Sequence, residues 1–154
     1  MRPDKRDPVP SNPRVISICL IGVAVALLVV GVVSGTFLRH VVQILPVILA
    51  VVVVDRRPHL GAYTALPIFV FWALIMLLIW LFLLGISRIA NGNYTVVEII
   101  CTLFIAGFSV CGIVKAMAVG KALRPLRKML AFATFAALQV AAMWVSFLPS
   151  IVNR

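Results

Sequence analysis

Residues 14–37 read RVISICLIGVAVALLVVGVVSGTF, and this nearly unbroken apolar run decides the class of fold. An α-helix rises about 1.5 Å per residue, so the run is long enough to cross the roughly 30 Å hydrocarbon layer of a bilayer. A cleaved signal peptide is the alternative, because basic residues precede the run. The run exceeds the usual apolar length of roughly 7–15 residues and has no Ala-x-Ala cleavage site at its end, which favours a retained helix.

Four further apolar runs follow, separated by short polar or basic segments. Together with the first run they predict helices at residues 14–37, 38–54, 62–87, 95–119 and 129–152. Of the 154 residues, 64% are hydrophobic and 12% are charged, whereas a soluble domain is roughly half apolar and a quarter charged. Lipid is the solvent in which a helix can be apolar on every side. The sequence therefore predicts an all-α integral membrane protein, a bundle of about five transmembrane helices, with one domain over residues 14–154.

Two parts of the chain depart from this simple pattern. Residues 1–13 contain several prolines among charged residues and predict a short flexible tail in water. The apolar part of the second run, residues 41–54, covers only about 21 Å as a helix, so crossing requires Phe37 and Leu38, a thinner bilayer or a re-entrant path. Pro46 inside this run removes one backbone hydrogen bond and favours a kink.

Lys and Arg are unevenly distributed between the two sides of a five-helix arrangement. Eleven fall on the side of the N-terminus, namely Arg2, Lys5, Arg6, Arg14, Arg56, Arg57, Lys115, Lys121, Arg124, Arg127 and Lys128. Three fall on the other side, namely Arg39, Arg88 and Arg154. Because short cytoplasmic loops are enriched in Lys and Arg, the N-terminus is predicted to be cytoplasmic and the C-terminus outside, in the cell membrane or, for a bacterium, the inner membrane. A re-entrant second run would reverse this bias, so the bias favours a full crossing.

The net charge of +10 is explained by this distribution. The basic residues form short clusters between apolar runs, whereas a nucleic-acid-binding domain carries them on one face of a water-soluble unit. No nucleic-acid partner is therefore expected, and the bilayer is the first predicted partner.

Glu98 is the one acid that falls within the predicted bilayer boundary, where a charge is costly and is commonly paired or functional. A candidate polar cluster near the outer face comprises Arg39, His40, Gln43, Arg88 and Glu98. In one interpretation Glu98 pairs with Arg39 or Arg88, and a small ligand or proton enters between them. In the other, which the sequence favours slightly, Glu98 only caps its helix through a capping box with Thr95.

Small residues recur at four-residue spacing in three of the predicted helices and allow close helix packing. The candidates are Gly31 and Gly35, then Gly112, Ala116 and Gly120, and finally Ala133, Ala137 and Ala141. Packing within one chain and a contact between two copies both explain them, and packing within one chain is favoured.

A basic segment precedes the last apolar run. Its residues Lys121, Arg124, Arg127 and Lys128 are candidate contacts for anionic lipid of the cytoplasmic leaflet. General attraction to that leaflet is favoured over a lipid-specific site, because cytoplasmic loops of this kind share it.

Motifs for catalysis, cofactors and metals are missing from the sequence. There is no GxSxG, no HExxH and no phosphate-binding glycine loop, and Glu98 has no second acid beside it in the membrane region. Cys19, Cys101 and Cys111 lie in apolar runs without CxxC spacing, so they are expected to act as small hydrophobic residues. The chain is therefore expected to be no enzyme and to bind no cofactor.

Two classes of function remain compatible with these features. The first is a non-catalytic accessory or assembly subunit that binds another membrane protein through helix–helix contacts. The alternative is a small oligomeric transporter or channel protomer that uses the outward-facing polar cluster. Small size, short loops and few polar groups favour the first class.

Overall fold

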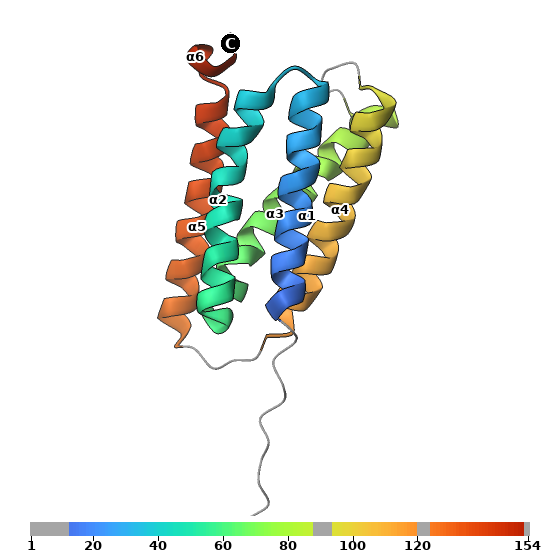
Figure 1. Ribbon diagram of the computed structural model, residues 1–154. Coiled ribbons are helices and arrows are strands. Elements are labelled where there is room, and N and C mark those ends of the chain that lie inside the picture. The colour runs from blue at the N-terminus through green and yellow to red at the C-terminus, as the bar shows by residue number, and fades with distance from the viewer. Residues whose placement is uncertain (1–12, 88–93, 120–123, 153–154) are drawn as a thin grey trace, which may run out of the picture.

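The computed structural model is all-helical and describes residues 13–87, 94–119 and 124–152 (Figure 1). Its helices are α1 (Pro13–Val33), α2 (Phe37–Arg56), α3 (Pro58–Leu83), α4 (Val96–Met117), α5 (Pro125–Ser146) and α6 (Pro149–Val152). The first five are long and apolar enough to span a membrane. This confirms the predicted all-helical chain with five candidate spans, while the predicted tail lies almost wholly outside the described residues.

The long helices alternate in direction, so each end of the bundle has its own set of connections (Figure 1). We call the end that holds the α1–α2 turn and α6 the upper end, and the end that holds the start of α1 and the α2–α3 connection the lower end. The described chain begins at the lower end and finishes at the upper end.

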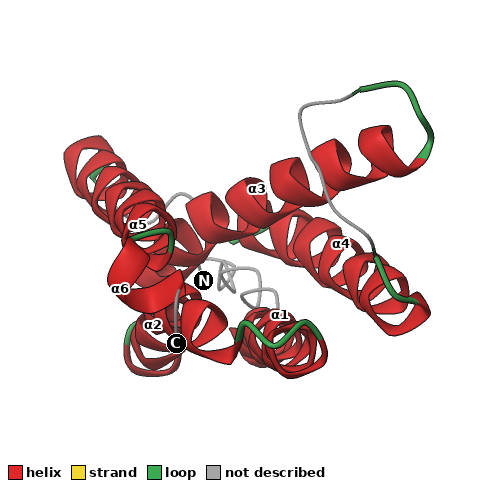
Figure 2. Cartoon of the chain, turned by 90° about the horizontal axis from the view of Figure 1, so that it is seen from above, coloured by secondary structure: helices red, strands yellow, loops and turns green. Residues whose placement is uncertain are grey.

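Helix α3 is the element around which the others are arranged (Figure 2). It packs on α2, α4 and α5 and makes a smaller contact with α1, whereas α1 packs mainly on α2 and α4. Within the described ranges, α4 and α5 make no contact with each other. Phe69 of α3 is fully buried in the apolar core.

Helices α1 and α3 end at Val33 and Leu83 instead of at the predicted residues 37 and 87, and each ends two residues before a glycine with positive φ, Gly35 and Gly85. Prolines account for the other main differences between the predicted and observed helix boundaries. Helix α3 begins at Pro58 instead of residue 62, and α5 begins at Pro125 instead of residue 129. Proline is favoured in the first turn of a helix, where its missing N–H needs no partner. At the other end α5 stops at Ser146, and the short α6 starts separately at Pro149 instead of continuing α5 to residue 152.

The second apolar run forms a helix longer than its apolar part. Helix α2 has 20 residues and takes in polar residues at both ends, including Arg39 and Asp55. A helix of this length rises about 30 Å, which matches the hydrocarbon thickness. At the lower end the Asp55 carboxylate is held against α1, since Ser17 Oγ donates to Asp55 Oδ1 at 2.6 Å.

Pro46 lies inside α2 without ending the helix. Close to it, the backbone carbonyl of Gln43 accepts a hydrogen bond from Gln139 Nε2 of α5 at 3.3 Å. The side-chain amide of Gln43 in turn donates to Ser146 Oγ at 2.9 Å and lies 3.2 Å from Met143 Sδ. These bonds join α2 to α5 beside Pro46, but they do not replace the helix bond that Pro46 removes, because the carbonyl freed by Pro46 is that of Val42, four residues earlier.

Candidate functional site

A cavity of about 700 Å³ lies at the upper end of the bundle and is lined by all five long helices. Four members of the predicted polar cluster line it, namely Arg39, His40 and Gln43 of α2 and Glu98 of α4. The fifth member, Arg88, lies outside the described residues. The structure therefore brings together in one cavity residues that are far apart in the sequence.

The lining of this upper cavity is polar near the α1–α2 turn and apolar closer to the middle of the bundle. Ser34 and Thr36 lie in the α1–α2 turn, on the same level as the polar cluster. Leu27, Met76 and Ile105 line the part that lies closer to the middle of the bundle. Such a cavity suits a small amphipathic molecule, because orienting polar groups and an apolar wall occur together.

Glu98 forms the capping box expected from the sequence. Its Oε2 accepts hydrogen bonds from the backbone N–H of Thr95 at 2.7 Å and from Thr95 Oγ1 at 2.8 Å, and its own N–H donates to Thr95 Oγ1 at 3.3 Å. Glu98 is only 8% exposed. Across the described ranges the structure records no ion pair between Glu98 and Arg39, so the alternative in which these two pair directly is not formed.

Arg39 makes a cation–π contact with an aromatic ring and no ion pair with Glu98 in the described part of the chain. Its guanidinium carbon lies 4.3 Å from the centroid of the Phe147 ring, just beyond the end of α5. Its Nε is buried and has no hydrogen-bond partner among the described residues. The guanidinium of Arg39 therefore lines the cavity, with the face of the Phe147 ring on one side and with an Nε–H donor that has no described partner.

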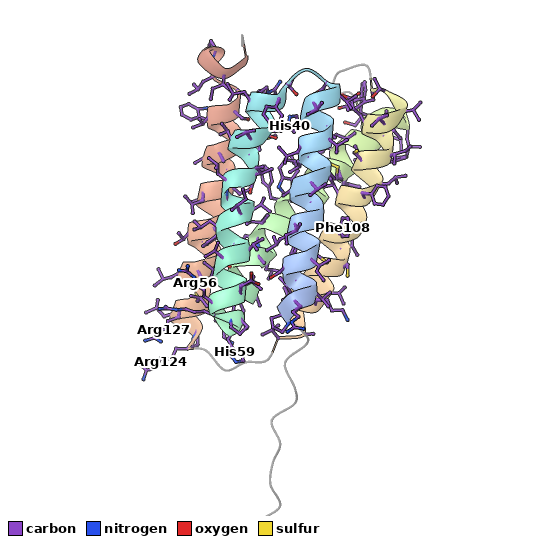
Figure 3. All side chains as sticks on the ribbon, viewed as in Figure 1. His40, Arg56, His59, Phe108, Arg124 and Arg127 are labelled. Carbon is purple, nitrogen blue, oxygen red and sulfur yellow. The ribbon has the colours of Figure 1, made fainter. Side chains whose placement is uncertain are left out.

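His40 is oriented by the turn that precedes it. Its Nδ1 lies 3.0 Å from the Thr36 carbonyl oxygen and 3.2 Å from Thr36 Oγ1, and it donates to the carbonyl when the proton is on Nδ1. The ring also packs on Gly31 of α1, since a Cβ added at Gly31 would lie 2.9 Å from His40 Cβ. His59 lies at the opposite end of the bundle (Figure 3). Among the described residues no group of three His, Cys, Asp or Glu side chains could hold a metal ion.

Aromatic residues of the cavity were missed at the sequence level. Trp72 is 2% exposed and lines the cavity, and its Nε1 has no partner within the described part of the chain. Tyr94 lines the cavity from the start of the α4 segment. Burial raises the pKa of the Tyr94 phenol, and the negative charge of Glu98 adds to the effect. Trp72 belongs to a helix that is apolar on nearly every side, so the sequence gave no sign that its N–H would be unpartnered.

The predicted packing residues fall into different environments. Gly31 contacts His40, and a Cβ at Gly112 would overlap the ring of Phe69. Ala116 is buried. Gly35 has a φ of +67° and no atom within 4 Å of an added Cβ, so it serves the α1–α2 turn instead of a helix contact. Gly120 lies outside the described residues.

The third set of small residues faces away from the bundle. Ala133, Ala137 and Ala141 of α5 are all exposed. The interpretation as packing within one chain is therefore wrong for this helix. The sequence also missed a close contact between α1 and α4, where Gly22 lies against the ring of Phe108 (labelled in Figure 3).

The basic segment before the last run lies at the lower end of the bundle. Arg124 and Arg127 are exposed at the start of α5 (Figure 3). The ammonium of Lys128 lies 5.1 Å from the centroid of the Tyr63 ring of α3. Lys121 falls outside the described residues.

Two of the three cysteines meet between α1 and α4. Cys19 of α1 and Cys111 of α4 lie near each other and line the same apolar groove between these helices. All three cysteines are free. Their spacing in the sequence gave no sign of this contact, because it depends on which faces of α1 and α4 pack together.

No family model, no curated protein and no solved structure matches this chain. Its function therefore has to be inferred from the geometry of its own residues.

Proposed function

We propose that this chain is a multi-pass membrane protein that acts without catalysis, as an accessory or assembly subunit that binds another membrane protein through its helices. The lower end faces the cytoplasm and the upper end faces outside. Basic residues of the described chain support this orientation. Arg14, Arg56, Arg57, Lys115, Arg124, Arg127 and Lys128 belong to the lower end, and Arg39 to the upper end. Cytoplasmic loops are enriched in Lys and Arg.

Helix α5 supplies the observation that supports assembly. It packs on α2 and α3 only among the long helices described, and it is the least buried of the five candidate spans. Three of its described side chains are buried, namely Phe135, Gln139 and Ser146. Most of its length is therefore available to a partner in the membrane.

The rotation of α5 is fixed by its polar bonds to α2. Gln139 and Ser146 both bond to Gln43, so this side of α5 faces inward. Ala137 then faces outward, two residues from Gln139 and about 200° round the helix. In lipid, helices associate by close van der Waals packing, and small residues allow the backbones to approach. An outward stripe of Ala133, Ala137 and Ala141 suits such a contact.

The assembly proposal is tested by extracting the full chain from its own membrane in mild detergent and measuring the mass of the complex by native mass spectrometry. We expect a stoichiometric second membrane protein, which Ala137→Leu releases because the bulkier side chain holds the backbones apart. Gly107→Leu is the matched control on α4, where an added Cβ has no atom within 4 Å. A chain that is monomeric and without a partner contradicts the proposal, as does a partner retained by Ala137→Leu.

The orientation is tested by fusing each terminus to a compartment-specific reporter. We expect a cytoplasmic signal from the N-terminus and an external signal from the C-terminus, because five spans place the two ends on opposite sides. A cytoplasmic signal from the C-terminus would contradict both the orientation and the odd number of crossings.

The upper cavity supports a second candidate, the small oligomeric transporter or channel protomer. Its specific support is a pair of donors that have no partner in the described part of the chain, Arg39 Nε and Trp72 Nε1, beside an apolar wall. Under this proposal the purified protein is a homo-oligomer and moves a proton, ion or small solute across liposomes, and Arg39→Gln reduces the flux. Reconstituted protein without any flux counts against it.

A further inference from the structure

A groove of about 600 Å³ lies at the lower end of the bundle, between the first turns of α3 and α5. Its walls are largely apolar and include Leu60 of α3 together with Leu130, Ala131 and Phe135 of α5. None of the residues described as lining it also lines the upper cavity. It is therefore a second, separate concave surface.

The groove carries basic side chains from two parts of the chain. Arg57 precedes α3, His59 belongs to its first turn, and Arg127 belongs to the first turn of α5. Arg57, His59 and Arg127 are all exposed (Figure 3 labels His59 and Arg127). The groove thus combines apolar walls with a rim that can bind a negative charge.

No acidic residue is among the described residues that line this groove. Asp55 is the acid closest to Arg57 in the sequence, and its carboxylate accepts from Ser17 on α1 at 2.6 Å. Glu98 lines the upper cavity instead. Both α3 and α5 also begin at this end without a side-chain cap, so their positive helix ends add to the positive potential.

We propose that this groove binds an anionic phospholipid of the cytoplasmic leaflet. Its phosphate lies between Arg57 and Arg127, where guanidinium groups bind phosphate oxygens in a bidentate geometry. One acyl chain runs along Leu130, Ala131 and Phe135. A soluble phosphate would leave this apolar wall without a ligand, which is why a lipid fits better. Basic pockets between membrane helices on the cytoplasmic side are a known way to bind such headgroups.

This site differs from general attraction to the basic segment before α5. Arg57 and His59 belong to the α2–α3 connection and the start of α3, so the groove needs a contact between helices that the segment alone cannot provide. The inference rests on the proposed membrane placement and orientation but not on assembly through α5. A protein that proves soluble without detergent would overturn the placement, independently of any result on lipid binding.

The first test compares two lipids with the same acyl chains and different headgroups. The full-length protein in mild detergent is titrated with palmitoyl-oleoyl phosphatidylglycerol or the corresponding phosphatidylcholine, and bound lipid is counted by native mass spectrometry. We expect phosphatidylglycerol to bind preferentially. In the double variant Arg57→Gln with Arg127→Gln, its affinity should fall by about tenfold or more. The control is Arg56→Gln with Arg124→Gln, which removes equal charge at the same end from residues that do not line the groove.

The second test changes the shape of the groove without changing charge. Ala131→Phe fills the apolar wall and should reduce binding of phosphatidylglycerol severalfold, whereas Val140→Phe, at an exposed position of α5 outside the groove, should not. Unchanged melting temperatures show that the variants fold. The proposal is overturned if both arginine pairs cause the same loss, if the two lipids bind equally, or if Ala131→Phe binds like the unaltered chain. An acidic protein that binds in place of lipid, and is lost with Arg57, would also overturn it.

Discussion

The side-chain amide of Gln139 donates a hydrogen bond to the backbone carbonyl of Gln43 at 3.3 Å, which joins α5 directly to the backbone of α2. The side chain of Gln43 returns a bond to α5 by donating to Ser146 Oγ at 2.9 Å. Gln43 and Gln139 are 4% and 0% exposed. In an apolar surrounding, such bonds determine which faces of two helices meet, because shape alone distinguishes weakly between apolar faces.

Breaking the bond between Gln43 and Ser146 should lower the free energy of unfolding. Gln43→Leu and Ser146→Ala each remove it, so a double-mutant cycle should give a coupling of about 0.6 kcal/mol and at most about 1.7 kcal/mol. Reversible unfolding in mixed micelles measures the energies. The control pairs Gln43→Leu with Ser109→Ala, which should be additive because Ser109 Oγ has no partner among the described residues. A coupling of zero for the first pair would contradict the contact.

The capping box predicts how substitutions at the start of α4 rank. Thr95→Ala and Glu98→Ala should each lower the free energy of unfolding by about 1 kcal/mol. Glu98→Gln should cost less, because glutamine still accepts from the Thr95 N–H. The same unfolding assay applies.

Arg39 and Glu98 should behave independently of each other. Glu98 is bonded to Thr95 and Arg39 lies over Phe147, so Glu98→Gln and Arg39→Gln should have additive effects on stability to within about 0.5 kcal/mol. A larger coupling in the double variant would show that the two side chains do form an ion pair.

Two glycines of α4 provide a matched test of how α3 and α4 pack. A Cβ at Gly112 would overlap the fully buried ring of Phe69, so Gly112→Ala should lower the free energy of unfolding by about 1–3 kcal/mol. Gly107 has no atom within 4 Å of an added Cβ. Gly107→Ala should therefore be neutral or stabilising by up to about 1 kcal/mol. Equal effects at the two positions would mean that α4 presents a different face to α3.

The native cysteines report on the contact between α1 and α4. Because Cys19 and Cys111 lie near each other in one groove between α1 and α4, oxidation of membranes with copper phenanthroline should join them within one chain. The number of thiols that a maleimide labels in the denatured chain should then fall from three to one. Cys19→Ser should abolish the link. A disulfide between two copies through Cys111, with Cys19 still free, would contradict the packing.

The sequence predicted those features that depend on residues near each other in the chain. Five apolar runs mark five helices, and the capping box of Thr95 and Glu98 follows from a spacing of three residues. Arg39, His40 and Gln43 were identified because polar residues are rare in apolar runs and therefore conspicuous.

Most contacts between helices could not be predicted from the sequence. A helix that is apolar on every side carries no periodic pattern to show which face is inward. For this reason the contact of Cys19 with Cys111 and the outward direction of Ala137 became visible only in the structure. Trp72 was missed as a cavity residue because its ring resembles any core aromatic side chain, and only its surroundings show an indole N–H without a described partner.

The central position of α3 has a consequence for biosynthesis. Ribosomes deliver helices to the membrane in chain order, and the contacts among α1 to α4 do not require α5, which in the described ranges touches only α2, α3 and the short α6. A chain that stops after Met117 should therefore still insert and pack. If the chain assembles through α5 as proposed, translation of this last long helix sets the moment at which the nascent protein becomes able to bind another subunit.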